Sequence, residues 1–220
     1  RQYLPEGCRA IVTGNPLRGG FQTLERETAR RELQLDERPL VLSFGGSLGA
    51  KPINTAMTEV LKKSHESGAF QHIHGTGKRD YGDTAAALEA AGVPLHGDGI
   101  WVREYIDDMP RCMAAADLVV CRCGAMTLSE LPAVGKPAIL IPSPYVAENH
   151  QYHNAMALVR RGAAECIEEK DLTGDKLWET IRRLAADPAR LAEMAENMRR
   201  AAILDAGERI LAVVQETLQR

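Results

Sequence analysis

The chain is 220 residues long, 45% of them hydrophobic and 26% charged, with a formal net charge of −3. This composition is ordinary for a globular protein and excludes a fibrous, collagen-like or disulfide-scaffold chain. Because 27 basic residues stand against 30 acidic ones, no global field favours nucleic acid as a partner, and no run of about 18 apolar residues predicts a membrane span. No secretory signal pattern opens the sequence, so we expect an intracellular protein.

Short apolar runs bounded by glycine or proline alternate with segments of helical periodicity. Near-continuous apolar strands between helices are typical of a parallel sheet covered on both faces. The sequence therefore predicts an α/β fold with a doubly wound parallel sheet. The predicted strands are Arg9–Thr13, Leu40–Phe44, Phe70–His74, Ile100–Val102, Leu118–Cys121, Ala138–Ile141 and Ala164–Ile167.

The first motif with chemical meaning is the glycine loop Gly45–Ala50, between the strand Leu40–Phe44 and a helix that opens near Lys51. Glycines let the backbone come close to a ligand, and the free N–H groups and dipole of a helix start favour a phosphate. Ser47 adds a hydroxyl donor. The glycines do not follow the G-x-G-x-x-G order of dinucleotide sites, and a turn that serves only packing is the alternative.

The second motif, Arg122–Glu130, repeats the order of strand, glycine turn and helix start after Leu118–Cys121. Thr127 can present a hydroxyl and an N–H group to a diphosphate, and Glu130 can accept hydrogen bonds from a ribose diol. The alternative for Glu130 is a carboxylate that only stabilises the helix dipole. Because ligands of open α/β sheets bind at the carboxyl ends of strands, we expect both loops to serve one ligand.

The five cysteines are an odd number in apolar surroundings, which favours a reducing compartment over a disulfide framework. Cys121 and Cys123 are two apart, so on a strand both thiols point to one face. A metal site is one interpretation of the pair. Burial as small apolar side chains is the favoured one, because no second Cys or His pair stands at a ligand spacing.

The third motif is a proline-stiffened loop that enters a helix, Ile141–Ala155. Its neutral side chains suit sugar hydroxyls, which need directional hydrogen bonds, although an exposed polar helix start is the alternative. His150 and His153 lack a third metal ligand. The chain also has no Asp-x-Asp, so we predict no metal, no cofactor and donor binding in which helix starts, hydroxyls and an arginine meet the diphosphate charge.

From Leu172 onward only helical patterns remain, and proline after Asp187 marks a break suited to a first helical turn. These helices either cap the sheet or include one that returns to a partner domain. No repeat or Pro/Ser-rich linker appears, so we treat residues 1–220 as one domain. The predicted helices are Leu172–Ala186, Ala189–Leu204 and Glu208–Leu218.

Five motifs in this order resemble the C-terminal, donor-binding domain of the bacterial transferases that add N-acetylglucosamine to undecaprenyl-diphospho-muramoyl-pentapeptide. The resemblance covers nearly the whole chain and implies the Rossmann-like half of a GT-B glycosyltransferase with extra C-terminal helices. The motifs are Thr13–Arg18, Gly45–Ala50, Glu104–Met109, Arg122–Glu130 and His150–Ala155.

The resemblance implies UDP-N-acetylglucosamine as donor. The residues that it implies are Arg18, Ser47, Ile106 through its backbone against uracil, Ala125, Met126, Thr127, Leu128, Ser129 and Glu130 around diphosphate and ribose, and Gln151 on the sugar. Ser47, Thr127 and Glu130 agree with the interpretation from the residues alone, whereas Ile106 comes only from the resemblance. Departures concern the sugar contacts: Cys123 replaces a common serine, and Leu48 and His150 replace glutamines.

The family also carries an N-terminal domain with the lipid acceptor groove, a membrane-facing patch and the proposed general base. We expect that domain to be absent here, residues 1–8 to be the tail of the interdomain linker, and the catalytic base to be unknown from this chain. The implied function is the donor half of an inverting, metal-independent transferase of peptidoglycan synthesis, peripheral to the cytoplasmic face of the bacterial membrane. The alternatives are a domain or subunit of another UDP-sugar lipid glycosyltransferase, or a non-catalytic nucleotide-binding module.

Overall fold

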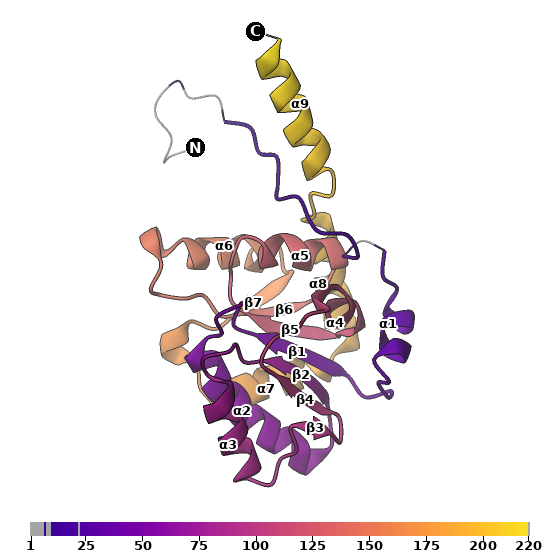
Figure 1. The fold of residues 1–220 in the computed structure, drawn as a ribbon, viewed down its shortest axis with the longest axis vertical. Coiled ribbons are helices and arrows are strands. Elements are labelled where there is room, and N and C mark those ends of the chain that lie inside the picture. The colour runs from indigo at the N-terminus through magenta and orange to yellow at the C-terminus, as the bar shows by residue number, and fades with distance from the viewer. Residues whose placement is uncertain (1–6, 8–9, 22, 220) are drawn as a thin grey trace.

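The computed structural model describes residues 7, 10–21 and 23–219, and its centre is a seven-stranded sheet in the order β3-β4-β2-β1-β5-β6-β7 (Figure 1). Six strands run parallel, and only β3 pairs antiparallel, with β4. The strands are β1 Leu40–Phe44, β2 Gln71–Gly75, β3 His96–Gly97, β4 Ile100–Arg103, β5 Leu118–Cys121, β6 Ala138–Leu140 and β7 Ala164–Cys166. The helices are α1 Arg26–Glu32, α2 Lys51–Ser67, α3 Tyr81–Glu89, α4 Met109–Ala115, α5 Thr127–Val134, α6 His150–Val159, α7 Gly174–Ala185, α8 Pro188–Arg200 and α9 Ala206–Leu218, with short 3₁₀ turns η1 Ala147–Asn149 and η2 Glu169–Asp171.

The sheet is covered on both faces because successive strand residues enter two different cores. In β1, Leu40 and Leu42 belong to one apolar cluster, whereas Val41 belongs to the other. Helices α1, α4, α5 and α6 contribute to the first cluster, and α2, α3 and α7 to the second. This two-sided burial explains why the strands read as continuous apolar runs, and it confirms the doubly wound α/β prediction.

The first strand of the sheet, β1, lies at its centre, with β2 on one side and β5 on the other. The chain leaves β1 toward α2 on one face, and α5 follows β5 on the opposite face. The loops after β1 and β5 therefore diverge at a topological switch point, where a crevice opens at the carboxyl edge of an α/β sheet. Both glycine loops predicted from the sequence lie at this point.

Six of the seven predicted strands are confirmed, and one is wrong. Arg9 lies outside the described residues, and the rest of Arg9–Thr13 forms no strand. The apolar side chains of Ile11 and Val12 are exposed, and the described part of the chain places no strand beside them to supply the hydrogen bonds of a ladder. The prediction for residues 1–8 likewise falls, except for Gly7, outside the described residues.

Helices α7 and α8 agree with the interpretation as a closing helical cap, whereas a helix that returns to a partner domain stays a prediction. Helix α7 packs along α2, and α8 packs on α5, so these two helices close the domain. Pro188 occupies the first turn of α8, and the Asp187 carboxylate accepts a hydrogen bond from the Arg190 N–H at 2.9 Å. Helix α9 instead extends away from the sheet, and only Ala206 of α9 is buried (Figure 1). Among the described residues, no helix is long and apolar enough to cross a bilayer.

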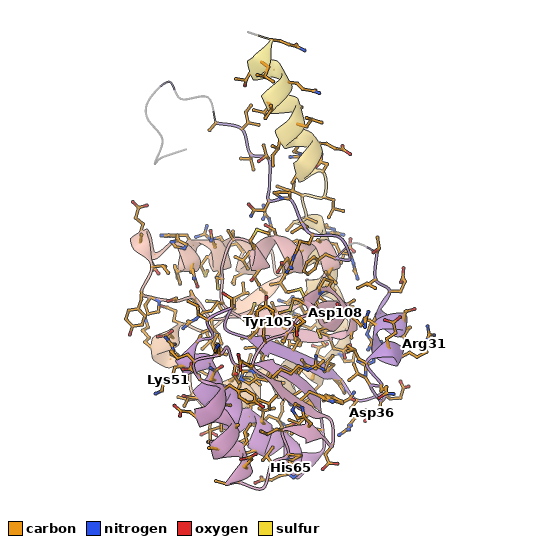
Figure 2. All side chains as sticks on the ribbon, in the orientation of Figure 1. Arg31, Asp36, Lys51, His65, Tyr105 and Asp108 are labelled. Atoms are coloured by element: carbon orange, nitrogen blue, oxygen red, sulfur yellow. The ribbon has the colours of Figure 1, made fainter. Side chains whose placement is uncertain are left out.

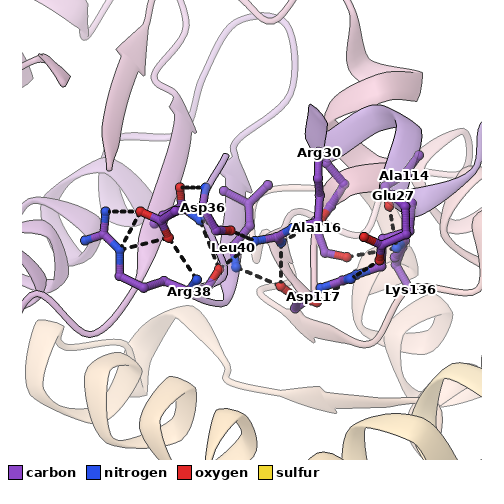
Figure 3. Close-up of polar contacts among 12 residues, drawn as sticks. Glu27, Arg30, Asp36, Arg38, Leu40, Ala114, Ala116, Asp117 and Lys136 are labelled. Atoms are coloured by element: carbon purple, nitrogen blue, oxygen red, sulfur yellow. Dashed lines mark hydrogen bonds and ion pairs between the residues drawn. The ribbon is translucent and has the colours of Figure 1, made fainter. Parts of the chain in front are cut away.

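Asp117, just before β5, forms several polar contacts (Figure 3). It lies at the end of the sheet opposite the glycine loops. Its carboxylate accepts hydrogen bonds from the Leu40 N–H at 2.8 Å, from Arg26 at 2.7 Å and from Arg30 at 3.1 Å. The Lys136 ammonium, whose pKa burial lowers to about 8, donates to the carbonyls of Ala114 and Ala116 in the same region. These contacts fix α1 and the start of β1 against the turn before β5.

Candidate functional site

Two cavities meet at the switch point between β1 and β5. The first, here called the Ile106 cavity, has a volume of about 260 Å³ and is lined by Arg18, Phe44, Gly46, Ser47, Gly75, Gly77, Glu104, Tyr105, Ile106, Met109, Met126, Thr127 and Glu130. The second, the Gln151 cavity, has a volume of about 510 Å³ and is lined by residues 45–52, Arg79, Arg122, Gly124, Thr127, Ser143, Tyr145, Gln151 and Glu169. Gly46, Ser47 and Thr127 line both, so the two cavities join at the two glycine loops.

The loop Gly45–Ala50 is held close to the sheet by backbone contacts. The Gly49 N–H donates to the Gly46 carbonyl at 3.0 Å, and both glycines have positive φ. A side chain at Gly45 would meet the backbone N of Ala50, so the loop can only close with glycine there. The first helical hydrogen bond of α2 runs from the Asn54 N–H to the Ala50 carbonyl at 3.0 Å, so the Lys51 and Ile53 N–H groups have no backbone partner among the described residues and can face a ligand.

The second loop places Thr127 at the first turn of α5. The Leu128 N–H donates to the Gly124 carbonyl at 3.0 Å, and the Ser129 hydroxyl donates to the Ala125 carbonyl at 2.9 Å. Asn15 joins the loop from the other side, because its amide donates to the Ser129 hydroxyl at 2.9 Å. Ala125, Leu128 and Ser129 thus shape the turn, while Thr127 lines both cavities.

Glu130 brings a half-buried carboxylate to the Ile106 cavity. Burial raises the pKa of the Glu130 carboxyl above its ordinary value, and the positive charge of Arg18 acts in the opposite direction. Within the described chain, neither carboxylate oxygen has a hydrogen-bond partner. A partly desolvated acceptor without a partner can accept hydrogen bonds from hydroxyl groups of a ligand.

Ile106 forms the inner wall of the Ile106 cavity. Its side chain is 4% exposed and packs over Gly75, where an added Cβ would lie 3.0 Å from the Ile106 Cδ1 atom. The residues before it bind the end of β2, since the Thr76 and Gly77 N–H groups donate to the carbonyls of Arg103 and Glu104 at 3.0 Å each. The Ile106 N–H and carbonyl have no hydrogen-bond partner among the described residues. Its backbone is therefore available to a planar ligand with donors and acceptors on its edge.

Gln151, in the first turn of α6, connects two loops of the Gln151 cavity. Its Oε1 accepts hydrogen bonds from the Ser143 N–H at 3.0 Å and from the Cys123 N–H at 3.3 Å. The amide nitrogen, Nε2, has no partner in the described part of the chain. Gln151 is thus fixed by its oxygen and can donate from its nitrogen.

Arg122 lines the Gln151 cavity, but its charge is already matched. Its guanidinium forms an ion pair with Glu169 and also donates to the Ile141 carbonyl at 3.2 Å. The side chains are 13% and 11% exposed, so the pair is largely desolvated. Its main effect is to tie the loop after β5 to the turn η2.

The buried cysteines of the described chain, Cys112, Cys121 and Cys123, behave as small apolar side chains. Cys121 and Cys123 are fully buried in the first apolar cluster, as the two-residue spacing predicts. Burial raises the pKa of the Cys112 thiol to about 11, so it stays protonated near neutral pH. Across the described ranges, no group of three or more His, Cys, Asp or Glu side chains could hold a metal ion.

The structure gathers seven of the ten sequence-predicted site residues at the two cavities: Arg18, Ser47, Ile106, Met126, Thr127, Glu130 and Gln151. The other three support the turn instead. Tyr105 lines the Ile106 cavity, and Arg79 and Tyr145 line the Gln151 cavity, although none of the three is among the site residues predicted from the sequence. The position of Tyr105 beside Ile106 is a signal that could have found it, and Figure 2 shows both Tyr105 and Lys51.

Comparison with curated proteins gives relatives over nearly the whole chain. A UDP-N-acetylglucosamine--N-acetylmuramyl-(pentapeptide) pyrophosphoryl-undecaprenol N-acetylglucosamine transferase of Acetivibrio thermocellus is 42% identical over 219 residues, which are 99% of this chain and 58% of the relative. The enzyme of the same name from Caldanaerobacter subterraneus subsp. tengcongensis is 41% identical over 97% of this chain and 58% of its own length. This chain therefore spans little more than half of these relatives.

Solved structures agree with the fold. The crystal structure of Acinetobacter baumannii MurG has a TM-score of 0.75 and 29% identity, covering 90% of this chain and 55% of that one. The structure of S. aureus MnaA with UDP has a TM-score of 0.68, covering 95% of this chain and 55% of that one, and at 15% identity it supports the fold alone. The parallel sheet and its helical layers match the Rossmann-like fold of GT-B glycosyltransferases.

A family model decides the assignment. The model of the glycosyltransferase family 28 C-terminal domain matches residues 40–210, from β1 into α9. This match covers well over half of the chain and includes both glycine loops, α5 and Gln151. The chain therefore belongs to glycosyltransferase family 28, through its C-terminal domain.

Proposed function

We propose that this chain binds UDP-N-acetylglucosamine as the donor domain of a transferase that adds N-acetylglucosamine to lipid-linked muramoyl-pentapeptide in peptidoglycan synthesis. The names of its relatives, which are N-acetylglucosamine transferases at 41–42% identity, support the donor and the acceptor class. The observation that carries the proposal is the junction of two cavities at Ser47 and Thr127, each beside a helix start. A nucleoside diphosphate sugar has the same order of parts: base and ribose, diphosphate, then sugar.

In this proposal the uridine occupies the Ile106 cavity. Uracil has donors and acceptors along one edge, which suit the unpaired backbone groups of Ile106. The Glu130 carboxylate accepts hydrogen bonds from the ribose hydroxyls, and Arg18 lies near enough to act on its charge. The sugar occupies the Gln151 cavity, where Nε2 of Gln151 donates to a hydroxyl.

The diphosphate lies at the junction, between the starts of α2 and α5. The positive ends of the two helix dipoles stabilise negative charge, and the hydroxyls of Ser47 and Thr127 add donors. When the acceptor hydroxyl displaces UDP from the anomeric carbon, charge develops on the departing diphosphate, and these groups stabilise it. Displacement from the opposite side inverts the anomeric carbon, and a base must take the hydroxyl proton.

We assign that base, the lipid acceptor site and attachment to the cytoplasmic face of the membrane to the part of the longer relatives that this chain does not cover. Helix α9 supports a partner of this kind, because it leaves the sheet with a row of exposed apolar side chains. They are Ile210, Leu211, Val214 and Leu218. On this proposal residues 1–220 form one donor domain that binds UDP-sugar alone and transfers nothing alone.

Isothermal titration calorimetry of the chain with UDP, UDP-N-acetylglucosamine and NAD tests the proposal. We expect both uridine nucleotides to bind and NAD to give no heat. NAD binding without UDP binding would overturn the donor assignment in favour of a dinucleotide module. Transfer of N-acetylglucosamine to the lipid acceptor by this chain alone would overturn the assignment of the base to another domain.

A further inference from the structure

Arg79, on the turn after β2, brings a positive charge to the Gln151 cavity. Its side chain is 70% exposed, and its Nε donates to the Asp80 Oδ1 atom at 3.1 Å. Its two terminal nitrogens have no hydrogen-bond partner in the part of the chain that the structure describes. The guanidinium is thus held through Nε, while its two terminal nitrogens can still donate to a ligand.

The Asp80 carboxylate, which accepts the hydrogen bond from Arg79, is itself held in place by Asn54. Asp80 is 6% exposed, and its Oδ2 atom accepts a hydrogen bond from Nδ2 of Asn54 at 3.1 Å. Asn54, 2% exposed on α2, also donates to the Thr76 carbonyl at 2.9 Å. A buried carboxylate needs a cation and hydrogen-bond donors, and Arg79 and Asn54 supply them.

The network connects three parts of the site. Asn54 lies in the first turns of the helix that follows the glycine loop, and Thr76 lies against Gly49 of that loop. Asp80 starts α3, directly after Arg79. The position of Arg79 is therefore set by the same contacts that hold the loop Gly45–Ala50.

The other cations near the diphosphate position are less suited to this role. Arg122 is paired with Glu169, and both side chains are largely buried. Arg18 lines the Ile106 cavity, where it acts on Glu130. Lys51 lines the Gln151 cavity, but its side chain has no hydrogen bond or ion pair within the described residues to hold it in place.

We propose that Arg79 binds the diphosphate of the donor, and that Asp80 and Asn54 are positioning residues for it. This inference rests on the proposed function. An arginine whose Nε is engaged by a carboxylate still presents terminal N–H groups, and such groups form short, charge-assisted hydrogen bonds to phosphate oxygens. Arg79 thereby supplies a positive side chain to the junction at which Ser47 and Thr127 supply hydroxyls.

Binding of UDP and of uridine to R79Q, R79K and R31Q tests the proposal. Uridine lacks the diphosphate, and Arg31 is an exposed arginine on α1 that Figure 2 shows far from Lys51. We expect R79Q to raise the Kd of UDP about tenfold and R79K to raise it less, because lysine keeps the charge but loses the fork. The Kd of uridine should not change in any variant, and R31Q should match the wild type.

A Kd of UDP within twofold of wild type in R79Q would overturn the inference, as would an equal loss for UDP and uridine. Weaker UDP binding in K51Q with unchanged binding in R79Q would also overturn the inference and would assign the diphosphate contact to Lys51. If the wild-type chain itself binds no UDP, the proposed function fails rather than the role of Arg79.

A double-mutant cycle of D80N and R79Q tests the positioning role of Asp80. If Asp80 acts through Arg79, D80N should weaken UDP binding in the wild type and have little further effect in R79Q. Effects of D80N and R79Q that simply add would contradict the positioning role. If D80N does not fold, N54S removes the donor to Oδ2 and takes its place in the cycle.

Discussion

Gly49 packs with its backbone directly against the carbonyl of Thr76, and a methyl group at Gly49 would collide with that oxygen. The reverse contact is equally close, because a methyl group at Gly77 would collide with the backbone N of Gly49. Both glycines have φ near +80°. Two loops that follow neighbouring strands are therefore in backbone contact at the junction of the cavities.

The substitution G49A should impair this junction. Alanine disfavours φ of +79° and the added methyl displaces the loop after β2, so we expect about 1–3 kcal/mol of lost stability and at least tenfold weaker UDP binding. Chemical denaturation and calorimetry measure the two effects. G82A is the matched control, because Gly82 lies in α3 with open space around it. A G49A chain that binds UDP like the wild type would contradict a phosphate role for the loop.

Glu130 should matter for binding and not for folding. In E130Q we expect the Kd of UDP to rise about tenfold, because a neutral amide accepts weaker hydrogen bonds from ribose hydroxyls than a carboxylate does. The melting temperature should stay the same or rise, since burial raises the pKa of Glu130 and so disfavours its charged form. E89Q, at an exposed position of α3, controls for loss of a negative charge. Unchanged UDP affinity in E130Q would leave Glu130 as a dipole-stabilising residue.

The same pKa shift predicts a pH dependence of donor binding. Because burial raises the pKa of Glu130, protonation begins at a higher pH than for an ordinary glutamate, and binding that needs the carboxylate weakens as pH falls through that pKa. We expect the affinity for UDP-N-acetylglucosamine to fall on acidification in the wild type and less in E130Q. Parallel pH profiles of the two proteins would contradict the ribose contact.

Two buried histidines of β2 should make the fold sensitive to acid. Burial lowers the pKa of His72 to about 3 and that of His74 to about 4, and the charge of His74 adds to the effect on His72. The His72 ring shares a hydrogen bond with the Ser64 hydroxyl and the His74 ring with the Ser43 hydroxyl, each at 2.8 Å. The other nitrogen of each ring has no partner among the described residues.

Since the unfolded chain binds these protons near pH 6.5 and the folded chain does not, stability should fall from about pH 6.5 toward pH 4, by roughly 1 kcal/mol per pH unit for each histidine. Denaturation of the wild type and H74Q across this range measures the slope. H74Q should have a smaller slope whatever its stability at pH 7. An unchanged slope would show that other groups cause the acid sensitivity.

The sequence was sufficient to predict the core of the fold because its strands are buried on both faces. In a run such as Leu118–Cys121 every residue is apolar, whereas a strand with one face in solvent alternates apolar and polar residues. The same rule failed at Ile11 and Val12, which are apolar but have no neighbouring strand. The two-residue strand β3 was missed because it is too short to show any period.

At the site, the two glycine loops could be predicted because each is a local pattern of strand, turn and helix. The arrangement of Asn54 and Asp80 around Arg79 could not be predicted from the sequence. Asn54 and Asp80 are 26 residues apart, on elements that only the crossover from α2 through β2 to α3 brings together. Asn54 and Asp80 are polar, and polar residues at such positions are usually exposed. Their burial and their hydrogen bond therefore become visible only in the folded structure.

A crystal structure of the chain with UDP-N-acetylglucosamine tests the central claim most directly. We expect uracil beside the backbone of Ile106, ribose hydroxyls on Glu130, the diphosphate between Ser47 and Thr127, and the sugar beside Gln151. A nucleotide bound in the reverse direction, or outside both cavities, would contradict the account.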